Sequence, residues 1–563
     1  MSRMKWMFVL LLVCLFVATD ASAQSAALFD ELEPLFADAD PAAGAPALRV
    51  DVPRGADAGF HLLVAGLEAG DELLVTAEMP PVAGVDLAPV ARLHAVPVER
   101  NTGLNGRTEL WDGKTNPHVI RRAPFHVFEA IQPGTPAIVV EAGPTAAFRV
   151  AARASQEAAP GEHAIQVRVV VHRKGTLITL PPLSAVVAVH AVSVPPVSGE
   201  TFGYVNWHNS GAIAKFHDVE PGSDAYWSLL EKYARLMVHG RQNAIRLNWG
   251  EFFARDTSAE GGERLVLDRE KLRRTVDVFT GAGIHWLMGG QPATRKGGDW
   301  NTDTLVLVGT GLDLGTPEGD AALRDALRQL REEIEANGWG HRWVQHVADE
   351  PTNRLAPAYK HAAAIVREAL GDVPIVEATM SEAVVGHVDW WSPQAHQFQR
   401  RRDFFAERKR AGDRVWVYTC LFPGGPWVNR LLDQERLRQV YVGWGAAAFD
   451  IDGFLHWGFN QWRVDPLVQT VVPHVSDRNE KSELPAGDTH IVYPGRDGPW
   501  SGVRFEAHRI GLEDRQLLQM LRAADPAAAD AIIAELFRGF DDFEKDVARY
   551  RAARRRLLER LSA

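Results

Sequence analysis

Arg342-Trp-Val-Gln-His-Val-Ala-Asp-Glu-Pro351 is a short apolar run that ends in two adjacent carboxylates and a proline. Residues 342–348 are too few for a core helix and predict a buried strand. The strand stops at Pro351, which lacks an N–H, and we expect the proline to hold Glu350 in an extended conformation. Asp349 and Glu350 would then point to opposite sides, so that one stays ionised and the other serves as a general acid. The alternative is that Asp349 caps a helix beginning near Asn353.

On both sides of this strand, short apolar runs alternate with longer amphipathic stretches. The predicted strands are Phe202–Trp207, Ala244–Trp249, Ile284–Met288, Arg342–Ala348, Pro374–Met380, Val388–Trp391, Arg414–Cys420 and Gly453–Trp457. The predicted helices are Asp224–His239, Asp268–Ala282, Pro317–Asn337, Arg354–Leu370, a short one near Glu382, Phe398–Arg410, Asp433–Ala448 and Arg504–Leu521. Eight such units are the number that closes a (β/α)8 barrel of the TIM type.

The remainder of the chain predicts a multidomain β plus α/β protein. Short strands separated by turns predict a β-sandwich from Leu48 to about Pro196, after an Ala/Pro-rich spacer. We therefore predict a linker and β-sandwich domain at 24–196, a barrel domain at 197–523 and a helical extension at 524–563. We expect the extension to pack outside the barrel, with its Arg-rich run (551–556) as a solvated face.

Residues 1–23 have the pattern of a secretion signal. Arg3 and Lys5 precede an apolar core, and Ala21-Ser-Ala23 is a small-residue cleavage site. We expect a secreted or periplasmic protein, because no later run is long and apolar enough to span a membrane. Cleavage removes Cys14 and leaves Cys420, so an intramolecular disulfide is excluded. The formal net charge of −11 argues against a nucleic-acid partner.

Aromatic and amide side chains gather where the predicted barrel strands end, which is where barrel enzymes bind their substrates. Tryptophan faces stack on pyranose rings, and amides and carboxylates bind hydroxyl groups, so this composition predicts a carbohydrate substrate. The candidate binding residues are Asn206, Trp207, Asn248, Trp390, Trp391, Tyr418, Trp457, Asn460 and Trp462. We expect no cofactor and no metal, since the phosphate-loop, Gly-x-Ser-x-Gly and His-Glu-x-x-His motifs are missing from the sequence.

A nucleophile is harder to assign than an acid. A retaining barrel glycosidase needs a second carboxyl group about 5 Å from its acid/base. The predicted strand Arg414–Cys420 ends without one. The substrate itself is then a candidate nucleophile.

Five motifs resemble glycoside hydrolase family 123 and the related domains of unknown function 4091. They are Ala348-Asp-Glu-Pro351, Asp389-Trp-Trp-Ser-Pro393, Val415-Trp-Val-Tyr-Thr-Cys420, Asp452-Gly-Phe-Leu-His-Trp457 and Gly487-Asp-Thr-His-Ile-Val-Tyr-Pro-Gly495. With Pro423, Asn429, Asn460 and Trp462, and with Arg504, Glu506, Gly511, Glu513 and Asp514 farther on, the resemblance covers roughly residues 203–521.

The resemblance implies a retaining, exo-acting β-N-acetylhexosaminidase of the N-acetylgalactosaminidase kind. Glu350 would be the general acid/base, and Asp349 would orient a 2-acetamido group that attacks the anomeric carbon. Two alternatives stay open. One is an inverting glycosidase on another sugar, with Asp389 or Asp452 as its base; the other is an inactive carbohydrate-binding protein. The loop 289–315 matches none of the motifs and is a candidate for setting a different substrate, and the sequence leaves the oligomeric state open.

Overall fold

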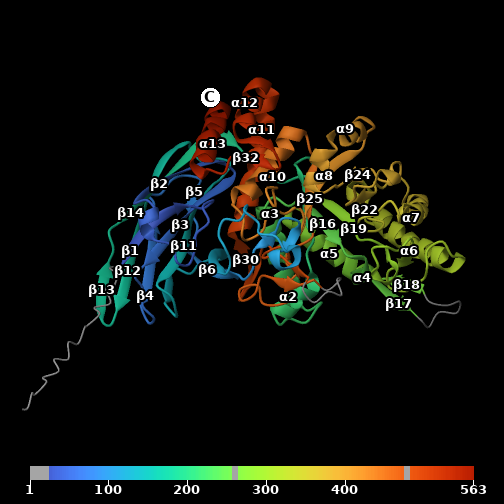
Figure 1. Ribbon diagram of the computed structural model, residues 1–563, viewed down its shortest axis with the longest axis horizontal. Helices are drawn as coiled ribbons and strands as arrows, with labels where there is room; N and C mark the ends of the chain where they lie inside the picture. The colour runs from blue at the N-terminus through green and yellow to red at the C-terminus, as the bar shows by residue number, and fades with distance from the viewer. Residues whose placement is uncertain (1–23, 257–263, 475–481) are drawn as a thin grey trace, which may run out of the picture.

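The computed structural model describes residues 24–256, 264–474 and 482–563 (Figure 1). The predicted secretion signal, 1–23, lies outside the described residues. Two regions lie side by side in Figure 1, a β-rich one formed mainly by the first part of the chain and a mixed α/β one formed by the rest.

The β-rich region contains two antiparallel-dominated sheets. The first has the order β1 (Ser25–Asp30), β3 (Ala56–Ala65), β11 (Thr145–Ala154), β6 (Ala91–Val98), β9 (Phe125–Gln132), β30 (Gly498–Gly502) and β29 (Tyr493–Gly495), with β5 (Val85–Leu87) on β11. The second has the order β10 (Ala137–Val139), β4 (Glu72–Glu78), β12 (Gly161–Arg173), β14 (Leu183–Ser193) and β2 (Ala47–Arg54), with β13 (Thr176–Thr179) on β12. Alternating apolar residues of both sheets, such as Leu62, Phe148, Val167 and Val187, meet in one core.

The predicted spacer before Leu48 is wrong in part. Residues 25–30 form β1, which pairs with β3 in the register Ala27 to Leu63 and Leu28 to Leu62. Leu28 is buried, because its side chain enters the core between the sheets. The Ala/Pro-rich composition of the residues that follow concealed this edge strand.

Eight parallel strands of the second region follow one another in the predicted chain order. Five form the sheet β15 (Gly203–Asn206), β26 (Gly453–His456), β25 (Arg414–Thr419), β24 (Trp390–Trp391) and β23 (Val376–Glu377). Three form the sheet β16 (Ala244–Leu247), β19 (Trp286–Gly289) and β22 (Trp343–Gln345). All eight contribute to one apolar cluster, whose buried members are Val205, Ala244, Met288, Val344, Val376, Ala378, Trp390, Trp416, Tyr418 and Leu455.

The strand pairing of the described residues does not show the predicted closed barrel. A single parallel bridge, Gln345 to Ile375, joins the three-stranded sheet to the five-stranded one. On the other side, Asn243 connects β16 to β15, with its N–H on the Tyr204 carbonyl and its side-chain oxygen accepting from the Tyr204 N–H at 2.9 Å. Continuous backbone ladders therefore form two separate sheets within the described residues.

The helices agree closely with the amphipathic pattern. The longer ones beside the strands are α3 (Asp224–His239), α5 (Arg269–Ala282), α6 (Pro317–Ala336), α7 (Ala356–Leu370), α8 (Ala395–Arg400), α9 (Arg402–Arg410), α10 (Leu437–Phe449) and α11 (Val503–Ala524). Short pieces are α1 (Glu109–Asp112), α2 (Ser210–Phe216) and α4 (Trp249–Phe252), and small hairpins are β7–β8 (102–103, 106–108), β17–β18 (253–256, 264–267), β20–β21 (293–295, 305–307) and β27–β28 (472–473, 483–484). Side-chain caps begin several of them, such as Ser223 at α3 and Thr316 at α6.

The structure of the C-terminal segment differs from two predictions. It contains α12 (Pro526–Leu536), a small hairpin (β31 537–539, β32 542–543) and α13 (Val547–Ser562), and α13 lies over the β-rich region beside α11 (Figure 1). Arg556 of the Arg-rich run is exposed, but Arg551 and Arg554 do not belong to a solvated face. Arg554 is 4% exposed and bonds the Asp514 carboxylate and the Asp51 carbonyl, and Arg551 forms a 2.7 Å ion pair with Asp30. The helix therefore joins the two regions instead of covering the barrel alone.

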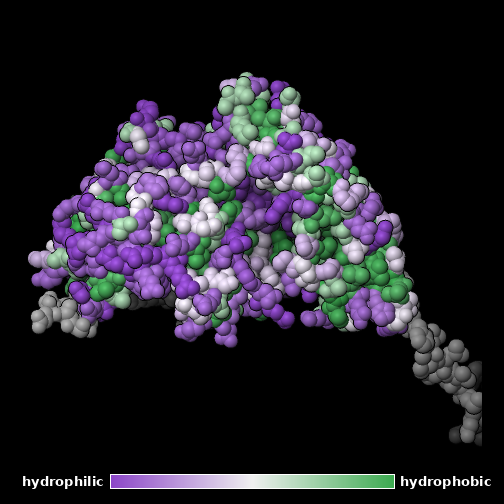
Figure 2. Space-filling model, turned by 180° about the vertical axis from the view of Figure 1, so that it is seen from behind, coloured by the Kyte–Doolittle hydropathy of each residue, from purple (hydrophilic) through white to green (hydrophobic). Residues whose placement is uncertain are grey.

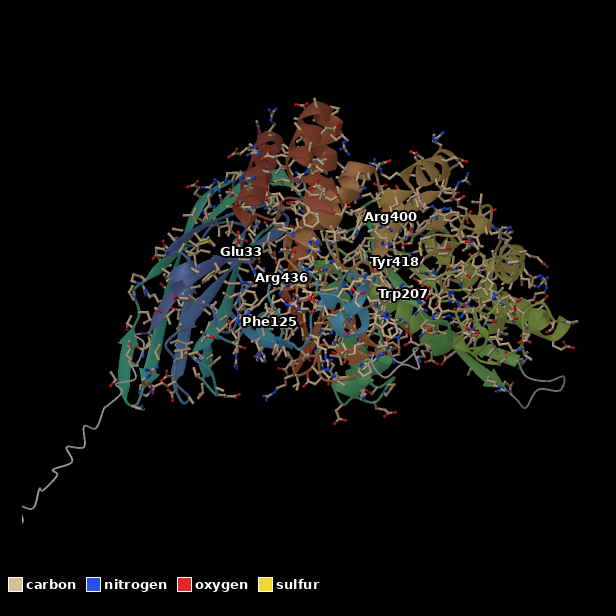
Figure 3. All side chains as sticks on the ribbon, in the orientation of Figure 1. Glu33, Phe125, Trp207, Arg400, Tyr418 and Arg436 are labelled. Carbon is tan, nitrogen blue, oxygen red and sulfur yellow. The ribbon has the colours of Figure 1, made fainter. Side chains whose placement is uncertain are left out.

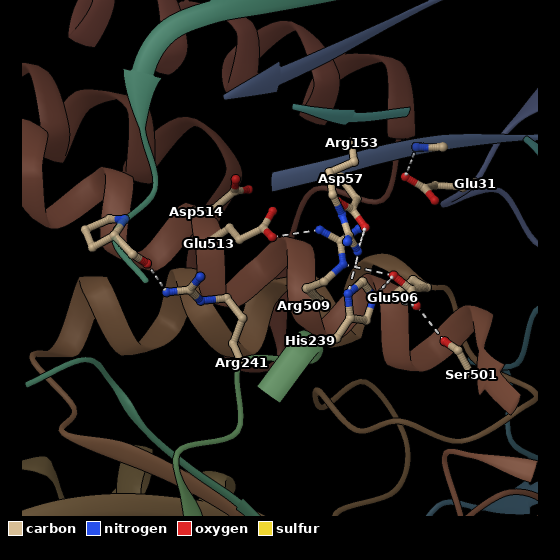
Figure 4. A network of polar contacts seen from close by, with 12 residues as sticks. Glu31, Asp57, Arg153, His239, Arg241, Ser501, Glu506, Arg509, Glu513 and Asp514 are labelled. Atoms are coloured by element: carbon tan, nitrogen blue, oxygen red, sulfur yellow. Dashed lines mark hydrogen bonds and ion pairs between the residues drawn. The ribbon is translucent and has the colours of Figure 1, made fainter. Parts of the chain in front are cut away.

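Charged residues also fill the contact between α11 and the β-rich region (Figure 4). Arg509 is the centre of this network, with Nε 2.9 Å from Glu506 and Nη1 2.7 Å from Glu513. Glu31 of the β-rich region pairs with Arg149 at 2.8 Å. Buried ions need partners of opposite charge: Arg509 has two within its own helix, and Arg149 of the β-rich region lies 3.8 Å from Glu506 of α11.

The outer surface is mostly hydrophilic over the α/β region, whereas hydrophobic residues gather over the β-rich region (Figure 2). The large exposed apolar side chains there include Leu74, Val139 and Leu177. Within the described residues, no helix is both long and apolar enough to cross a membrane.

Candidate active site

The Asp349-Glu350 pair follows β22 at the carboxyl end of the parallel strands. Glu350 has a φ of +47°, in the left-handed region that non-glycine residues seldom adopt, so the predicted extended conformation is wrong. The helix-cap alternative is also wrong, because α7 begins at Ala356 and its N-cap is Leu355. The two acids thus lie in a strained turn between a strand and a helix. Strain of this kind persists where surrounding contacts hold it, and it clusters at functional sites.

Arg295 holds this turn from β20. Its Nη1 donates to the Asp349 carbonyl at 2.9 Å, and its Nη2 donates to the Glu350 carbonyl at 2.6 Å. The same hairpin bonds the strand end directly, since the Ala293 N–H donates to the Val347 carbonyl at 3.1 Å. The loop 289–315, for which the motifs gave no role, therefore supports the two carboxylates.

The Glu350 carboxylate turns toward β25. Tyr418 donates its hydroxyl to Glu350 Oε1, and both side chains lie beside the apolar cluster of the strands. Burial and the neighbouring Asp349 charge raise the pKa of Glu350 to about 7, against the opposing effects of Tyr418 and Arg295. A carboxyl group with this pKa can hold a proton at neutral pH and release it during a reaction.

Asp349 lies among groups of both charges. Burial, reinforced by the Glu377 carboxylate, raises its pKa, while His346, Arg246 and Arg295 act in the opposite direction. No group within the described part of the chain donates a hydrogen bond to the Asp349 carboxylate. The carboxylate oxygens are therefore available to a ligand.

Glu377, at the end of β23, is a residue that the sequence analysis missed. It is fully buried, and its Oε1 accepts the N–H groups of Val347 at 2.6 Å and Ala348 at 3.1 Å. Its Oε2 lies 3.3 Å from His346 Nδ1. Burial raises the pKa of Glu377 to about 8. It positions the strand end that carries the two acids, and its place at the end of a predicted strand was the available signal.

Trp207 is a second predicted aromatic residue near this strand end. Its ring is edge-on to His346 at 5.8 Å, and the Arg246 guanidinium lies 4.3 Å from its centroid. Figure 3 shows Trp207 and Tyr418 close together in the α/β region, and both contact the strand-end cluster. Trp207 and Tyr418 therefore pack on the same strand-end cluster, and Tyr418 also contacts Glu350.

The comparison with known families addresses this region of the chain. Residues 268–521 match the family model described as glycoside hydrolase 123, catalytic domain. The chain carries a glycoside hydrolase 123 catalytic domain. It is accordingly a glycoside hydrolase, and the matched residues include Asp349, Glu350, Glu377 and Tyr418.

A solved family 123 glycoside hydrolase from Clostridium perfringens, reported for glycolipid glycan hydrolysis, has the same fold. The TM-score is 0.73 at 12% identity, over 96% of this chain and 98% of that one. A β-D-glucuronidase from Dictyoglomus thermophilum (TM-score 0.34, 10% identity, 81% and 89% covered) and a xylanase from Thermobacillus composti (0.31, 14%, 55% and 97%) are too distant to bear on the fold. No curated protein matches the chain.

Several predicted binding residues of the glycoside hydrolase 123 domain are structural. Trp391 is fully buried between β24 and the helices, where Nε1 donates to Asp413 and the ring contacts Phe404. Trp390 is 5% exposed and stacks on Trp416. Both were read as strand-end residues, but β24 is only two residues long, so they form the strand itself.

The two predicted binding residues in the loop after β26 also have structural contacts. Asn460 is fully buried, and its side chain bonds both backbone groups of Asn209. Trp462 donates to the Val492 carbonyl and packs on Phe216, away from the acids. These two residues hold loops together and do not face a ligand.

The other strand-end predictions are more varied. Asn206 is fully buried and accepts from Arg430 Nη1 at 2.5 Å. Asn248 is exposed before α4. Trp457 is half-buried and donates its indole N–H to Asp488 at 3.3 Å. Asn206 thus binds the buried Arg430, while Asn248 and Trp457 keep surface that a ligand could contact.

Asp389 and Asp452 cannot serve as the base of an inverting reaction. Asp389 accepts the Ile375 N–H at 2.7 Å just before β24, and Asp452 accepts the Val415 N–H at 2.7 Å just before β26. Both therefore lie at the amino ends of strands, opposite the end that carries Glu350. No cluster of three or more His, Cys, Asp or Glu suited to a metal occurs in the ranges that the structure describes.

Proposed function

We propose that this glycoside hydrolase is a retaining, exo-acting β-N-acetylhexosaminidase that uses substrate-assisted catalysis. The observation that supports this best is the division of labour in the Asp349-Glu350 pair. Glu350 is held by Tyr418 with a pKa near neutrality, and the Asp349 carboxylate accepts no described donor. The other nearby carboxylates, Glu377 and Asp488, are fully buried and out of reach of a sugar.

Each acid then has one task in the reaction. Glu350 donates its proton to the glycosidic oxygen as the bond to the anomeric carbon breaks. The carbonyl oxygen of the 2-acetamido group attacks that carbon and forms an oxazolinium ring. Opening of this ring by water then restores the original anomeric configuration. Asp349 accepts the acetamido N–H and stabilises the positive charge of the ring. Glu350, now ionised, takes a proton from the water that opens the ring, so the enzyme returns to its starting state.

The proposed substrate is a terminal β-linked hexosamine on a glycan or glycoconjugate. Trp207 offers an apolar face for the sugar, beside the two acids. The Clostridium perfringens enzyme with the same fold is reported for glycolipid glycans, which is consistent with such a substrate class.

The proposed architecture is a β-sandwich followed by a (β/α)8 barrel and a helical extension, at 24–196, 197–523 and 524–563. The shared cluster of all eight parallel strands and the Gln345–Ile375 bridge support the barrel. We also propose that the protein is secreted after cleavage behind Ala23. Intact-mass measurement of protein from the culture medium or periplasm would show a mature chain beginning at Gln24.

Matched substrates test the proposed chemistry. We expect hydrolysis of aryl β-glycosides that carry a 2-acetamido group, and a first-formed product with the β configuration. A thiazoline analogue of the oxazolinium ring should inhibit tightly. If the enzyme prefers 2-hydroxy sugars, ignores the thiazoline or releases the α anomer first, substrate-assisted retention is wrong.

A further inference from the structure

Trp300 lies at the tip of the β20–β21 hairpin and has an unusual environment. It is 50% exposed, although indole rings are large apolar groups that usually pack inside. The Arg295 guanidinium lies 3.9 Å from its ring centroid. One face of the ring is thus covered by a cation, and much of the remaining surface faces solvent.

The hairpin beneath the ring is firmly held. Ala293, Leu305 and Leu307 are buried in the core, and β20 pairs with β21 through Thr294 and Val306. At the tip, Asp299 accepts the Asn301 N–H at 2.9 Å. A tryptophan on such a base keeps its position without a ligand, so little ordering is required when a ligand binds.

Arg295 connects this ring to the acid/base. The guanidinium that lies over Trp300 also donates to the carbonyls of Asp349 and Glu350. Arg295 itself is only 9% exposed, and its Nε has no partner among the described residues. The ring is therefore fixed at a short distance from the residue that protonates the glycosidic oxygen, but outside the apolar cluster of the strands.

We propose that Trp300 is a stacking platform for a sugar ring on the leaving-group side of the scissile bond. An exo-acting enzyme encloses the terminal sugar and leaves the rest of the glycan toward solvent. Tyr418, which bonds Glu350, is buried in the strand-end cluster, whereas Trp300 is half exposed and is connected to the Glu350 backbone through Arg295. Its ligand is thus the second pyranose of the glycan. This inference rests on the proposed role of Glu350.

Two substrates with the same terminal sugar separate this role from others. One is a disaccharide, and the other is the methyl β-glycoside, which also has an alkoxide leaving group but no second ring. We expect Trp300→Ala to lower kcat/KM for the disaccharide by about tenfold, as the loss of one stacked ring face predicts. The methyl glycoside should stay within about twofold, and Trp300→Phe should recover most of the disaccharide activity.

Trp111→Ala is a matched control. Trp111 is 41% exposed and also lies under an arginine, Arg107, at 4.5 Å, but it belongs to α1, whose neighbouring hairpin contacts the loop 421–433 and, within the described residues, makes no contact with Arg295 or Glu350. We expect no difference between the two substrates in this variant. Equal losses on both substrates with Trp300→Ala, no loss on either, or the same selective loss with Trp111→Ala would overturn the proposal.

The pair of disaccharide and methyl glycoside also tests the role of Trp300 independently of the proposed hexosaminidase activity. If the wild type rejects 2-acetamido sugars, the hexosaminidase proposal fails, and the same pair of substrates is made with the sugar that it accepts. A selective loss with Trp300→Ala would then still support the platform.

Discussion

Replacing Tyr418 by Phe should move the pH dependence of catalysis upward. The Tyr418 hydroxyl donates to Glu350 Oε1, and this bond favours the ionised carboxylate. A hydrogen bond to a charged group contributes about 1.5–3 kcal/mol, and one pKa unit corresponds to about 1.4 kcal/mol. Without the donor, the pKa of Glu350 should therefore rise by about one to two units from its value of about 7.

The observable is the basic limb of kcat/KM, which reports the proton donor in the free enzyme. Wild type should lose activity as the pH rises through about 7, because Glu350 gives up the proton that it must donate. Tyr418→Phe should keep its activity to higher pH, by the same one to two units. A 2-acetamido glycoside with a poor leaving group is the appropriate substrate, since its cleavage depends on protonation.

Tyr359→Phe is the control for this measurement. Tyr359 is another buried tyrosine that donates to a carboxylate, Glu377 Oε1, at 3.3 Å. Because Glu377 is not the proposed proton donor, loss of the Tyr359 hydroxyl should leave the basic limb in place. A basic limb that stays fixed or moves down in Tyr418→Phe would refute the assignment of Glu350. A shift of equal size in Tyr359→Phe would show that the limb reports the fold.

Three further variants test the remaining parts of the site. Glu350→Gln should lower the rate by about 10²–10⁴ on substrates with poor leaving groups and far less on those with acidic ones, and its pH profile should lose the basic limb; equal losses would exclude it as the donor. Glu350→Gln should also be more stable than wild type at pH 8, by a margin that is smaller or missing at pH 4. The pKa of Glu350 is raised from 4.5 to about 7, so its ionisation above pH 4.5 destabilises the folded wild type. Melting curves in which the difference between variant and wild type does not grow with pH would contradict the raised pKa. Asp349→Asn should lower kcat on 2-acetamido substrates by about 10²–10³ with little change in KM, and a mainly raised KM would reduce Asp349 to a binding residue. Arg295→Met should shift the basic limb upward, since the Arg295 charge lowers the pKa of Glu350, and an unchanged limb would leave Arg295 with a structural role alone.

The parallel-strand region was largely predictable because each local pattern agrees with the tertiary structure. The predicted helix Asp224–His239 is α3 to the residue, and the predictions for α5 and α6 differ from the structure by one residue at one end. Their apolar stripes recur at helical spacing, and capping residues precede them. The central strands were found but predicted too long, because buried apolar runs continue past the last ladder hydrogen bond.

The roles of the tryptophans could not be read from position along a strand. Trp391 and Trp462 occur in the same kind of context as Trp207, yet they bond Asp413 and Val492, whereas Trp207 packs against His346, between β22 and the acids. The side that a ring faces depends on a shift of one residue in a strand of two to four residues. Composition therefore indicates a carbohydrate substrate, in agreement with the family match, but it does not place the individual side chains.

The ion pairs between the β-rich region and the C-terminal helix could not be predicted from the sequence either. The arginines of α13 look like a solvated run in sequence, but Arg551 and Arg554 pair with Asp30 and Asp514. Asp30 is separated from Arg551 by 521 positions. No local pattern carries that information, because a partner so distant is specified by the packing of whole elements.

The conformation of Glu350 is the most consequential feature that sequence patterns missed. A proline at 351 disfavours the helical region for the preceding residue, and the sequence alone points to an extended backbone. The structure instead has a left-handed residue, at a cost of about 1–3 kcal/mol that surrounding contacts must offset. Arg295 offers two hydrogen bonds to this turn from a loop more than fifty positions away. The strain turns the Glu350 carboxylate toward Tyr418 while Asp349 stays near Arg246 and Glu377, so the two acids occupy different environments for a reason other than strand alternation.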